Sequence, residues 1–359
     1  MQKAIPCMLL RGGTSKGTYY LSSDLPEDPA EREQALLGVM GSPDPRQIDG
    51  VGGAHPLTSK VAIVKKSERE GIDVDYLFVQ VVVDEARTST AQNCGNILAG
   101  VGPFAIESGL VEAEDGETVV TVYMENTDSI ARQRIMTPGK QVQYAGNAAI
   151  DGVPGTHAPI MIEFVGVAGS SCGELFPTGN VQDEVDGIPV TMVDNGMPVV
   201  MMPAASLGLR GDEGIADLEA NQALKERVEA IRLKVGPMMN LGDVKDKTVP
   251  KMTIVSSPMN GGLINTRSFI PHRVHDAVGV LAAASVAVAA TTPGAVGNDM
   301  ADIPDGARKL CHVEHPTGAL AVEVEPSDAP DDLAPKSVAI MRTARLLMSG
   351  TAYYLPGSK

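Results

Sequence analysis

The sequence is poor in aromatic and basic residues. It has no Trp, five Phe and seven Tyr among 359 residues, so its cores must be built from Val, Ile, Leu, Ala and the seventeen Met. Its 29 Lys and Arg stand against 45 Asp and Glu, a formal net charge of −16. Nucleic-acid binding needs clustered basic side chains, which this composition does not favour. A small anionic substrate is compatible with the charge, because a few N–H groups and cations set the field of a pocket.

Cysteines and long apolar runs are also scarce. The four cysteines, Cys7, Cys94, Cys172 and Cys311, are far apart in the sequence and form no CxxC pair, which argues against a zinc site or a disulfide framework. The N-terminus lacks the apolar core of a secretory signal. The longest apolar stretch, 278–290, is too short to span a bilayer. We therefore predict a cytoplasmic protein with reduced thiols, no metal and no membrane contact.

Short strand-like segments dominate the chain, in keeping with its 38 Gly and 25 Pro. Apolar alternation or β-branched runs predict strands at 5–10, 17–21, 61–64, 76–83, 119–124, 160–165, 190–193, 197–202, 251–255, 319–324 and 338–342. Helices are predicted at 28–40, 95–108, 215–234 and 275–290. Pro103 is the one sign against an unbroken helix over 95–108.

Two of these helices, 95–108 and 275–290, are apolar nearly all round, which is typical of helices buried on every side. A chain of 359 residues also exceeds the usual size of a single core. We predict an α+β fold with two domains, 1–170 and 171–340, each wrapping strands around one central helix. Residues 341–359 form a C-terminal segment, and we consider that it returns to the first domain.

A single thiol lies in the stretch "STAQNCGNILAG", 89–100. Cys94 stands at the predicted start of a helix, where unpaired N–H groups and the helix dipole stabilise a thiolate. Asn93, Gly95 and Asn96 add backbone and amide donors suited to a carboxylate or enolate oxygen. The alternative is that Cys94 is a small buried apolar residue, as free cysteine commonly is. The residues alone leave both interpretations open.

A lysine stands directly before a buried strand in "GGAHPLTSKVAIV", 52–64. Lys60 follows Thr58 and Ser59 at the edge of that strand. Its side chain could simply extend to water along the apolar surface. A desolvated amine, by contrast, loses its proton more readily and becomes a usable general base near neutral pH.

A glycine-rich stretch, "RGGTSKG" at 11–17, joins two predicted strands. Its glycines let the backbone approach a ligand closely, and Arg11, Thr14 and Ser15 can bind an anion. The spacing of a P-loop is absent and no helix follows. A plain hairpin turn is the alternative.

A basic cluster stands out in the acidic chain at "NTRSFIPHRVHDAVG", 265–279. Arg267, His272 and Arg273 precede the second buried helix and are candidates for binding carboxylates. A solvated helix start is the alternative interpretation.

Six stretches together resemble a known family over essentially the whole chain: "RGGTSKG", "HPLTSKVAIV", "NCGN", "LFPTGN", "DGVPGTHAPI" and "HPTGALAVEVE". They resemble the 2-methylaconitate isomerase and 4-oxalomesaconate isomerase/tautomerase family. That family is similar in fold to diaminopimelate epimerase, with two pseudo-equivalent domains and an active site at the N-termini of the central helices. The resemblance implies a cofactor-independent isomerase of unsaturated tricarboxylates, with Lys60 and Cys94 as catalytic residues.

The resemblance also implies roles for the other candidates. Lys60, as a neutral amine, would remove an allylic proton, and donors at the Cys94 helix start would hold the resulting negative charge. Whether Lys60 or Cys94 delivers the second proton is left open. The second helix begins "VHDAVGV" without a cysteine, which disfavours a two-thiol racemase. Substrate-binding residues are predicted at Arg11, Thr14, Ser15, Ser59, Asn93, Gly95, Asn96, Arg267, His272 and Arg273.

The stretch "VMGSPDPRQIDGVGGAHPLTSKVAIV" looks closer to the 4-oxalomesaconate enzymes of aromatic-acid breakdown, the protocatechuate, gallate and lignin routes. The alternatives are a 2-methylaconitate or aconitate isomerase and, in another class, a non-catalytic tricarboxylate-binding protein. The expected partner is a small tricarboxylate substrate, and a homodimer is considered.

Overall fold

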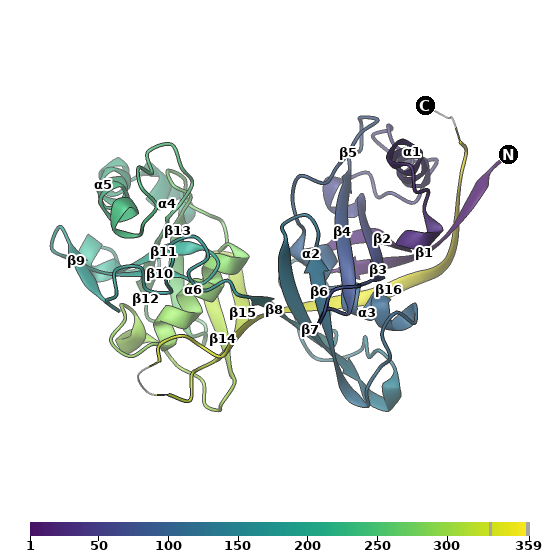
Figure 1. The fold of residues 1–359 in the computed structure, drawn as a ribbon. Coiled ribbons are helices and arrows are strands. Elements are labelled where there is room, and N and C mark those ends of the chain that lie inside the picture. Colours follow the sequence, from purple (N-terminus) through teal and green to yellow (C-terminus); the bar gives the residue numbers. More distant parts are fainter. Residues whose placement is uncertain (330–331, 357–359) are drawn as a thin grey trace. The chain divides into compact units, whose positions relative to one another are not determined.

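The structure is a computed structural model that describes residues 1–329 and 332–356. Its contacts divide the chain into two compact units. Unit 1 comprises Met1–Val165 and Arg342–Lys359, and unit 2 comprises Gly166–Met341. The boundaries predicted from the sequence are 170 and 340. Figure 1 shows the elements of both units coloured along the chain.

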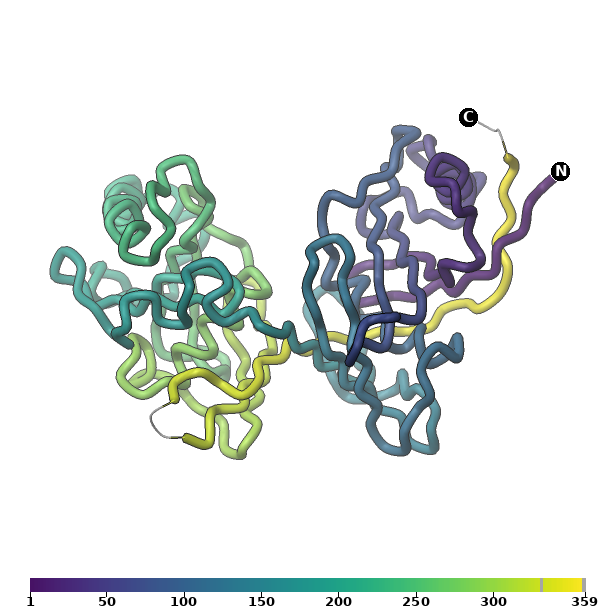
Figure 2. Tube along the Cα trace, in the orientation of Figure 1, coloured from purple at the N-terminus to yellow at the C-terminus, as the bar shows by residue number. Residues whose placement is uncertain are grey.

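Unit 1 is a strand-rich body closed by both ends of the chain. Its elements are β1 (Lys3–Gly12), β2 (Ser15–Leu21), α1 (Pro29–Met40), β3 (Lys60–Lys66), β4 (Val74–Val81), β5 (Thr88–Ser89), α2 (Gly95–Leu98), α3 (Val101–Glu107), β6 (Gly116–Met124), β7 (Ser129–Thr137), β8 (Pro159–Val165) and most of β16 (Ser337–Tyr354). β16 pairs antiparallel with β1, from Lys3 opposite Tyr354 to Gly12 opposite Ala344. The two terminal strands therefore run side by side, purple and yellow in Figure 2.

The sheet of unit 1 separates two apolar cores. One lies against α2 and α3 and includes Leu10, Tyr76, Phe78 and Phe104. The other lies against α1 and consists mainly of aliphatic side chains, with Cys7, Met40, Tyr20 and Tyr354. α1 begins where the Asp28 carboxylate accepts hydrogen bonds from two backbone N–H groups of its first turn. It ends at Gly41, which has a φ of 81°.

Unit 2 has the same two-sided construction. Its elements are β9 (Asp183–Val185), β10 (Ile188–Asp194), β11 (Pro198–Pro203), α4 (Ile215–Ala220), α5 (Gln222–Met238), β12 (Lys251–Ser256), β13 (Ile264–Phe269), α6 (Val280–Thr291), β14 (Lys309–His315), β15 (Gly318–Glu325) and the start of β16. α5 packs on β10 and β12 through Val228, Ile231 and Val235. α6 is buried almost throughout and contacts β10, β11, β14 and β15.

Apart from the short strands β5 and β9, the two units repeat one order of elements: two strands, a helical segment, two strands, a buried helical segment, and three more strands. The parallel pairs repeat as well, since β2–β3 and β4–β6 in unit 1 correspond to β11–β12 and β13–β14 in unit 2. The predicted α+β fold, with each domain built around a central buried helix, is confirmed.

The predicted helix 95–108 is wrong as one continuous helix, because the structure breaks it into α2 and α3. Pro103 has no N–H to offer the carbonyl four residues earlier. At the break, the side-chain amide of Gln133 from β7 enters the helix. Its Oε1 accepts from the Gly102 N–H at 2.7 Å and its Nε2 donates to the Leu98 carbonyl at 2.6 Å. Gln133 thus replaces the one helical hydrogen bond that would have joined these two residues.

Two other predicted helices are also corrected. The span 215–234 is split into α4 and α5, because the Asn221 side chain accepts the Leu224 N–H at 3.0 Å and caps a new helix. The span 275–290 becomes α6, which starts only at Val280. The His275 N–H donates to the Ser268 carbonyl instead, and this turn delays the helix.

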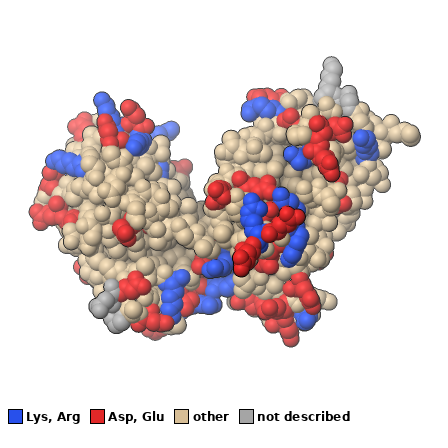
Figure 3. Space-filling model, viewed as in Figure 1, with Lys and Arg blue, Asp and Glu red and all other residues tan. Residues whose placement is uncertain are grey.

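The surface mixes both signs of charge. On the face drawn in Figure 3, acidic side chains lie among the basic ones. Within the described part of the chain, no helix is long and apolar enough to cross a membrane.

We expect Gln133→Leu to lower the free energy of unfolding by about 2–3 kcal/mol, because two core backbone groups would lose their partner. Gln133 is fully buried, whereas Gln143 is exposed and makes one bond to a neighbouring carbonyl. Gln143→Leu should therefore change the free energy by less than about 0.5 kcal/mol. Urea unfolding followed by circular dichroism measures both. Equal losses in the two variants would contradict the account of the helix break.

Candidate active site

Lys60 is the first residue of β3 and lies between Gly17 of β2 and Gln80 of β4. A Cβ atom at position 17 would lie 2.3 Å from the Lys60 carbonyl oxygen, so only glycine fits there. Lys60 is only 6% exposed. Its Nζ donates to Gln80 Oε1 at 2.7 Å and lies 5.0 Å from the centroid of the Phe78 ring. The amine is therefore held inside unit 1 and does not extend to solvent.

Cys94 precedes α2 in an extended conformation and is half-buried against the core of unit 1. Its backbone N–H donates to Asn93 Oδ1 at 2.7 Å. The Asn93 Nδ2 atom in turn lies 2.8 Å from the Met124 sulfur. Gly95 opens α2, whose first N–H groups have no preceding helical carbonyl to bind. Because α2 is a single turn, it lacks the dipole of a long helix.

Asn126 links β4, the strand paired with the Lys60 strand, to the segment that leads to Cys94. Its Oδ1 accepts from the Phe78 N–H at 2.8 Å. Its Nδ2 donates to the carbonyls of Phe78 and Thr90, each at 2.9 Å. The helical turn after Cys94 also contacts β1, β2 and β3. The two predicted catalytic residues therefore belong to one side of the unit 1 sheet.

The glycine-rich hairpin between β1 and β2 packs directly on α2. A Cβ atom at Gly13, whose φ is 51°, would lie 2.2 Å from Asn96 Oδ1. The Asn96 Nδ2 donates to Thr14 Oγ1 at 3.0 Å. Ser15 is buried, and its Oγ has no hydrogen-bond partner among the described residues. Thr14, Ser15 and Asn96 thus come together beside the start of α2.

Arg11 supports this hairpin from within. Its Nη1 donates to the Gly13 carbonyl at 2.9 Å and to both the carbonyl and the hydroxyl of Thr343 at 3.0 Å. Burial and the nearby Arg345 lower the pKa of Arg11. Its Nη2 is buried and unpartnered within the described part of the chain. A role of Arg11 in substrate binding stays a prediction.

Ser59 is fully buried beneath the loop that precedes Lys60. Its hydroxyl lies 2.8 Å from Gln47 Oε1 and 2.9 Å from the His55 carbonyl. Its own carbonyl accepts from the Gln80 side chain at 3.0 Å. In this structure Ser59 holds the loop, and its predicted contact with substrate is untested.

Arg267 lies on β13 of unit 2 and is 8% exposed. Its Nε donates to the Glu213 carbonyl, and its Nη1 donates to Asn265 Oδ1 and the Thr266 carbonyl, all at 2.9 Å. Burial lowers the pKa of Arg267, against the opposing effect of nearby carboxylates. These contacts fix the guanidinium to its own strand and a neighbouring loop.

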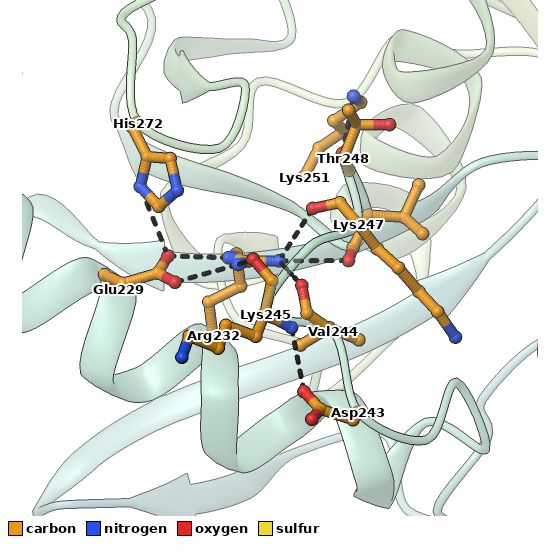
Figure 4. Close-up of polar contacts among 10 residues, drawn as sticks. Glu229, Arg232, Asp243, Val244, Lys245, Lys247, Thr248, Lys251 and His272 are labelled. Carbon is orange, nitrogen blue, oxygen red and sulfur yellow. Dashed lines mark hydrogen bonds and ion pairs between the residues drawn. The ribbon is translucent and has the colours of Figure 1, made fainter.

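His272 and Arg273 lie on the turn after β13 and do not share the contacts of Arg267. The His272 Nδ1 lies 3.7 Å from the Glu229 carboxylate. Glu229 in turn binds the fully buried Arg232 of α5, whose guanidinium also donates to carbonyls of the 244–249 segment (Figure 4). Arg273 is exposed, and its carbonyl accepts from the Ile270 N–H at 2.8 Å. The predicted basic cluster is therefore spread over separate contacts in unit 2.

The other three thiols are buried, unlike Cys94. Burial and the nearby Asp194 raise the pKa of Cys172 to about 12. Burial raises the pKa of Cys311 to about 11 and also raises that of Cys7. Among the residues that the structure describes, no three His, Cys, Asp or Glu side chains gather as a metal site requires.

Residues 2–355 match the family model described as PrpF protein, and the chain belongs to that family. It is 60% identical over 348 residues to "(4E)-oxalomesaconate Delta-isomerase" from Novosphingobium sp., covering 97% of each chain. It is 55% identical to "4-oxalomesaconate tautomerase" from Pseudomonas putida, over 97% of this chain and 96% of the relative. It is 34% identical to "2-methyl-aconitate isomerase" from Cupriavidus necator, over 97% of this chain and 96% of that one.

A solved structure supports the same family. The crystal structure of methylitaconate-delta-isomerase superposes with a TM-score of 0.87 at 33% identity, over 98% of this chain and 96% of the other. The predicted family resemblance and the predicted enzyme class, an isomerase, are confirmed.

Three residues around the candidate site were missed from the sequence: Gln80 and Phe78, which contact the Lys60 amine, and Asn126, which binds the backbone of Phe78 and Thr90. Gln80 carried a signal. It follows Tyr76 and Phe78 at alternate positions of a predicted strand, so it faces the same side as two core residues. A polar residue at such a position has to find a polar partner. Asn126 lies in a turn and carried no comparable signal.

We expect iodoacetamide at pH 8 to alkylate Cys94 well before the other cysteines of the native protein. A raised pKa lowers the thiolate fraction at a given pH, and burial blocks access to Cys7, Cys172 and Cys311. Peptide mapping by mass spectrometry after timed labelling measures this order. The urea-unfolded protein, in which all four thiols should react, is the control. Labelling of Cys172 or Cys311 as fast as Cys94 would contradict the assignment.

Proposed function

We propose that this protein isomerises 4-oxalomesaconate by moving a proton, without a cofactor. The identities of 60% and 55% to two proteins named for that substrate support it over a 2-methylaconitate or methylitaconate substrate, for which the named relatives are 34% identical. We place the reaction in the cytoplasm, where free thiols such as these four stay reduced.

The buried amine of Lys60 is the observation that carries the proposal. In a conjugated C=C–C=O system, a proton on the carbon beyond the double bond is acidic once the dienolate is stabilised. Lys60, as a neutral amine, takes this proton and the C–H electron pair enters the dienolate. A proton then returns to the other end of the allylic system, or to oxygen for an enol product. The double bond moves and no net proton is gained or lost.

The segment around Cys94 supplies the groups that stabilise the dienolate in this proposal. The backbone N–H groups of Gly95 and Asn96 open a helical turn and are suited to a developing oxyanion. The hydroxyl groups of Thr14 and Ser15 lie beside them and would bind a carboxylate. Cys94 itself is the candidate for returning the second proton, with Lys60 as the other. The carboxylate contacts from unit 2 stay with Arg267, His272 and Arg273 as predictions.

We expect deuterium from heavy water to enter 4-oxalomesaconate at one allylic carbon when the protein is added. Proton NMR with 4-oxalomesaconate, 2-methylaconitate and trans-aconitate in parallel reports the substrate, the position of exchange and the product together. Exchange in 2-methylaconitate or trans-aconitate alone would mean that this acid, and not 4-oxalomesaconate, is the substrate. Tight binding of a tricarboxylate without exchange in any of them would support a binding protein and contradict an isomerase.

Single substitutions test the proposed catalytic roles of Lys60 and Cys94. Lys60→Met should lower exchange by about 10²–10⁴-fold, the usual contribution of a general base, while the fold is retained. Cys94→Ser should also lower it. Lys251 offers a matched control, since it is the first residue of β12, the strand equivalent to β3 in unit 2. Lys251→Met should keep nearly full activity. Full activity in Lys60→Met would exclude this lysine as the base.

A further inference from the structure

Among the described residues, Gln80 is the one side chain with a polar atom within hydrogen-bond distance of the Lys60 amine. It lies directly opposite Lys60 in the antiparallel pair of β3 and β4, so both side chains leave the sheet on the same face. The distance from Lys60 Nζ to Gln80 Oε1 is 2.7 Å, which is short for an N–H···O bond.

The Gln80 amide has one possible orientation. Its Nε2 donates to the carbonyls of Pro56 and Val81, each at 3.1 Å, and of Ser59 at 3.0 Å. Three acceptors thus surround the nitrogen. Rotating the amide by 180° would place its oxygen against three carbonyl oxygens and would lose all three of these hydrogen bonds. The backbone of the loop before β3 therefore fixes Gln80 with its oxygen toward Lys60.

This fixed oxygen bears on the proton transfer itself. When the Lys60 amine accepts a proton from carbon, positive charge develops on Nζ inside the protein. The carbonyl dipole of Gln80 and the face of the Phe78 ring, 5.0 Å away at its centroid, are already directed at that charge. Neither group has to reorganise as the charge forms. The hydrogen bond also holds Nζ in one place, which matters because small displacements of a base are costly in rate.

We infer that Gln80 is a positioning residue for the reaction, which orients the Lys60 amine and stabilises its protonated form during proton transfer. The inference rests on the proposed function, in which Lys60 is the base. It adds a residue from β4 that does not touch the substrate and acts only through Lys60.

Two substitutions at this position should shift the pH dependence in opposite directions. Gln80→Leu removes the acceptor, so the ammonium form is less favoured and the rising limb of kcat against pH moves to lower pH. Gln80→Glu places a carboxylate beside the amine, so the limb moves to higher pH. We expect each shift to be about one pH unit or more. In Gln80→Leu the plateau value of kcat should fall about tenfold or more, whereas KM should change by less than about threefold.

Leu36→Ala is the matched control for lost stability. Leu36 is a buried residue of α1 in the other core of unit 1, away from the Lys60 amine. This variant should lower the thermal midpoint and leave the pH limb in place. Thermal unfolding and circular dichroism on all variants separate folding from rate. If Gln80→Leu does not fold, Gln80→Met, which has nearly the length of glutamine and no amide oxygen, tests the same shift to lower pH.

The outcomes separate the two claims. Unchanged pH limbs in both Gln80 variants, with Lys60→Met inactive, would overturn the role of Gln80 and keep the lysine base. Full activity in Lys60→Met would overturn the proposed base, whatever the Gln80 variants do. Limbs that move in opposite directions in Gln80→Leu and Gln80→Glu support the inference, because a purely structural glutamine would not produce them.

Discussion

A lysine amine can stay inside a protein only where polar groups replace its water shell, and the candidate site of this protein is built around that constraint. The amine of Lys60 keeps one acceptor, the oxygen of Gln80, and one aromatic face, that of Phe78. Several local features follow from it. Gly17 lets β2 approach the start of β3, and the loop carbonyls of Pro56 and Ser59 hold the Gln80 amide.

Two glutamines of unit 1 occupy core-facing positions, and the side chain of each hydrogen-bonds to backbone groups of another segment. Gln80 links β4 to the loop before Lys60, and Gln133 links β7 to the broken helix after Cys94. Asn126 adds a third amide between β4 and the segment at Thr90. The irregular chain segments around the site are therefore held by side-chain amides rather than by regular secondary structure. Such contacts fix loops that carry functional residues while leaving their outer surface free.

Much of the architecture could be predicted from local pattern. Strands such as β3, β11 and β12 were found because each contains a run of at least four β-branched or apolar residues. β13 was missed because its sequence, "INTRSF", carries four consecutive polar residues, and their side chains are buried and hydrogen-bonded. The break between α2 and α3 depends on Gln133, a residue of a distant strand, although Pro103 gave a local warning.

The candidate site shows the same division. Lys60 and Cys94 were chosen from their motifs, and their catalytic roles stay predictions. The contact between Thr14 and Asn96 was not predicted. The contacts of Arg11, Ser59 and Arg267 with nearby backbone could not be predicted, because a motif does not say which way a polar side chain turns. Gln80 was correctly placed in a predicted strand, but its contact with Lys60 was not predicted. Only the pairing of β3 with β4 shows that the two side chains face each other.

In the proposed reaction, the Lys60 amine, held by Gln80, takes a proton from a carbon of a tricarboxylate. A crystal structure of the protein with an unreactive tricarboxylate analogue would show whether Nζ reaches that carbon. We expect Lys60 Nζ about 3–3.5 Å from the carbon that loses its proton, with the Gln80 hydrogen bond intact. An analogue bound with that carbon out of reach of Nζ, and with another basic side chain beside it, would rule out Lys60 as the base.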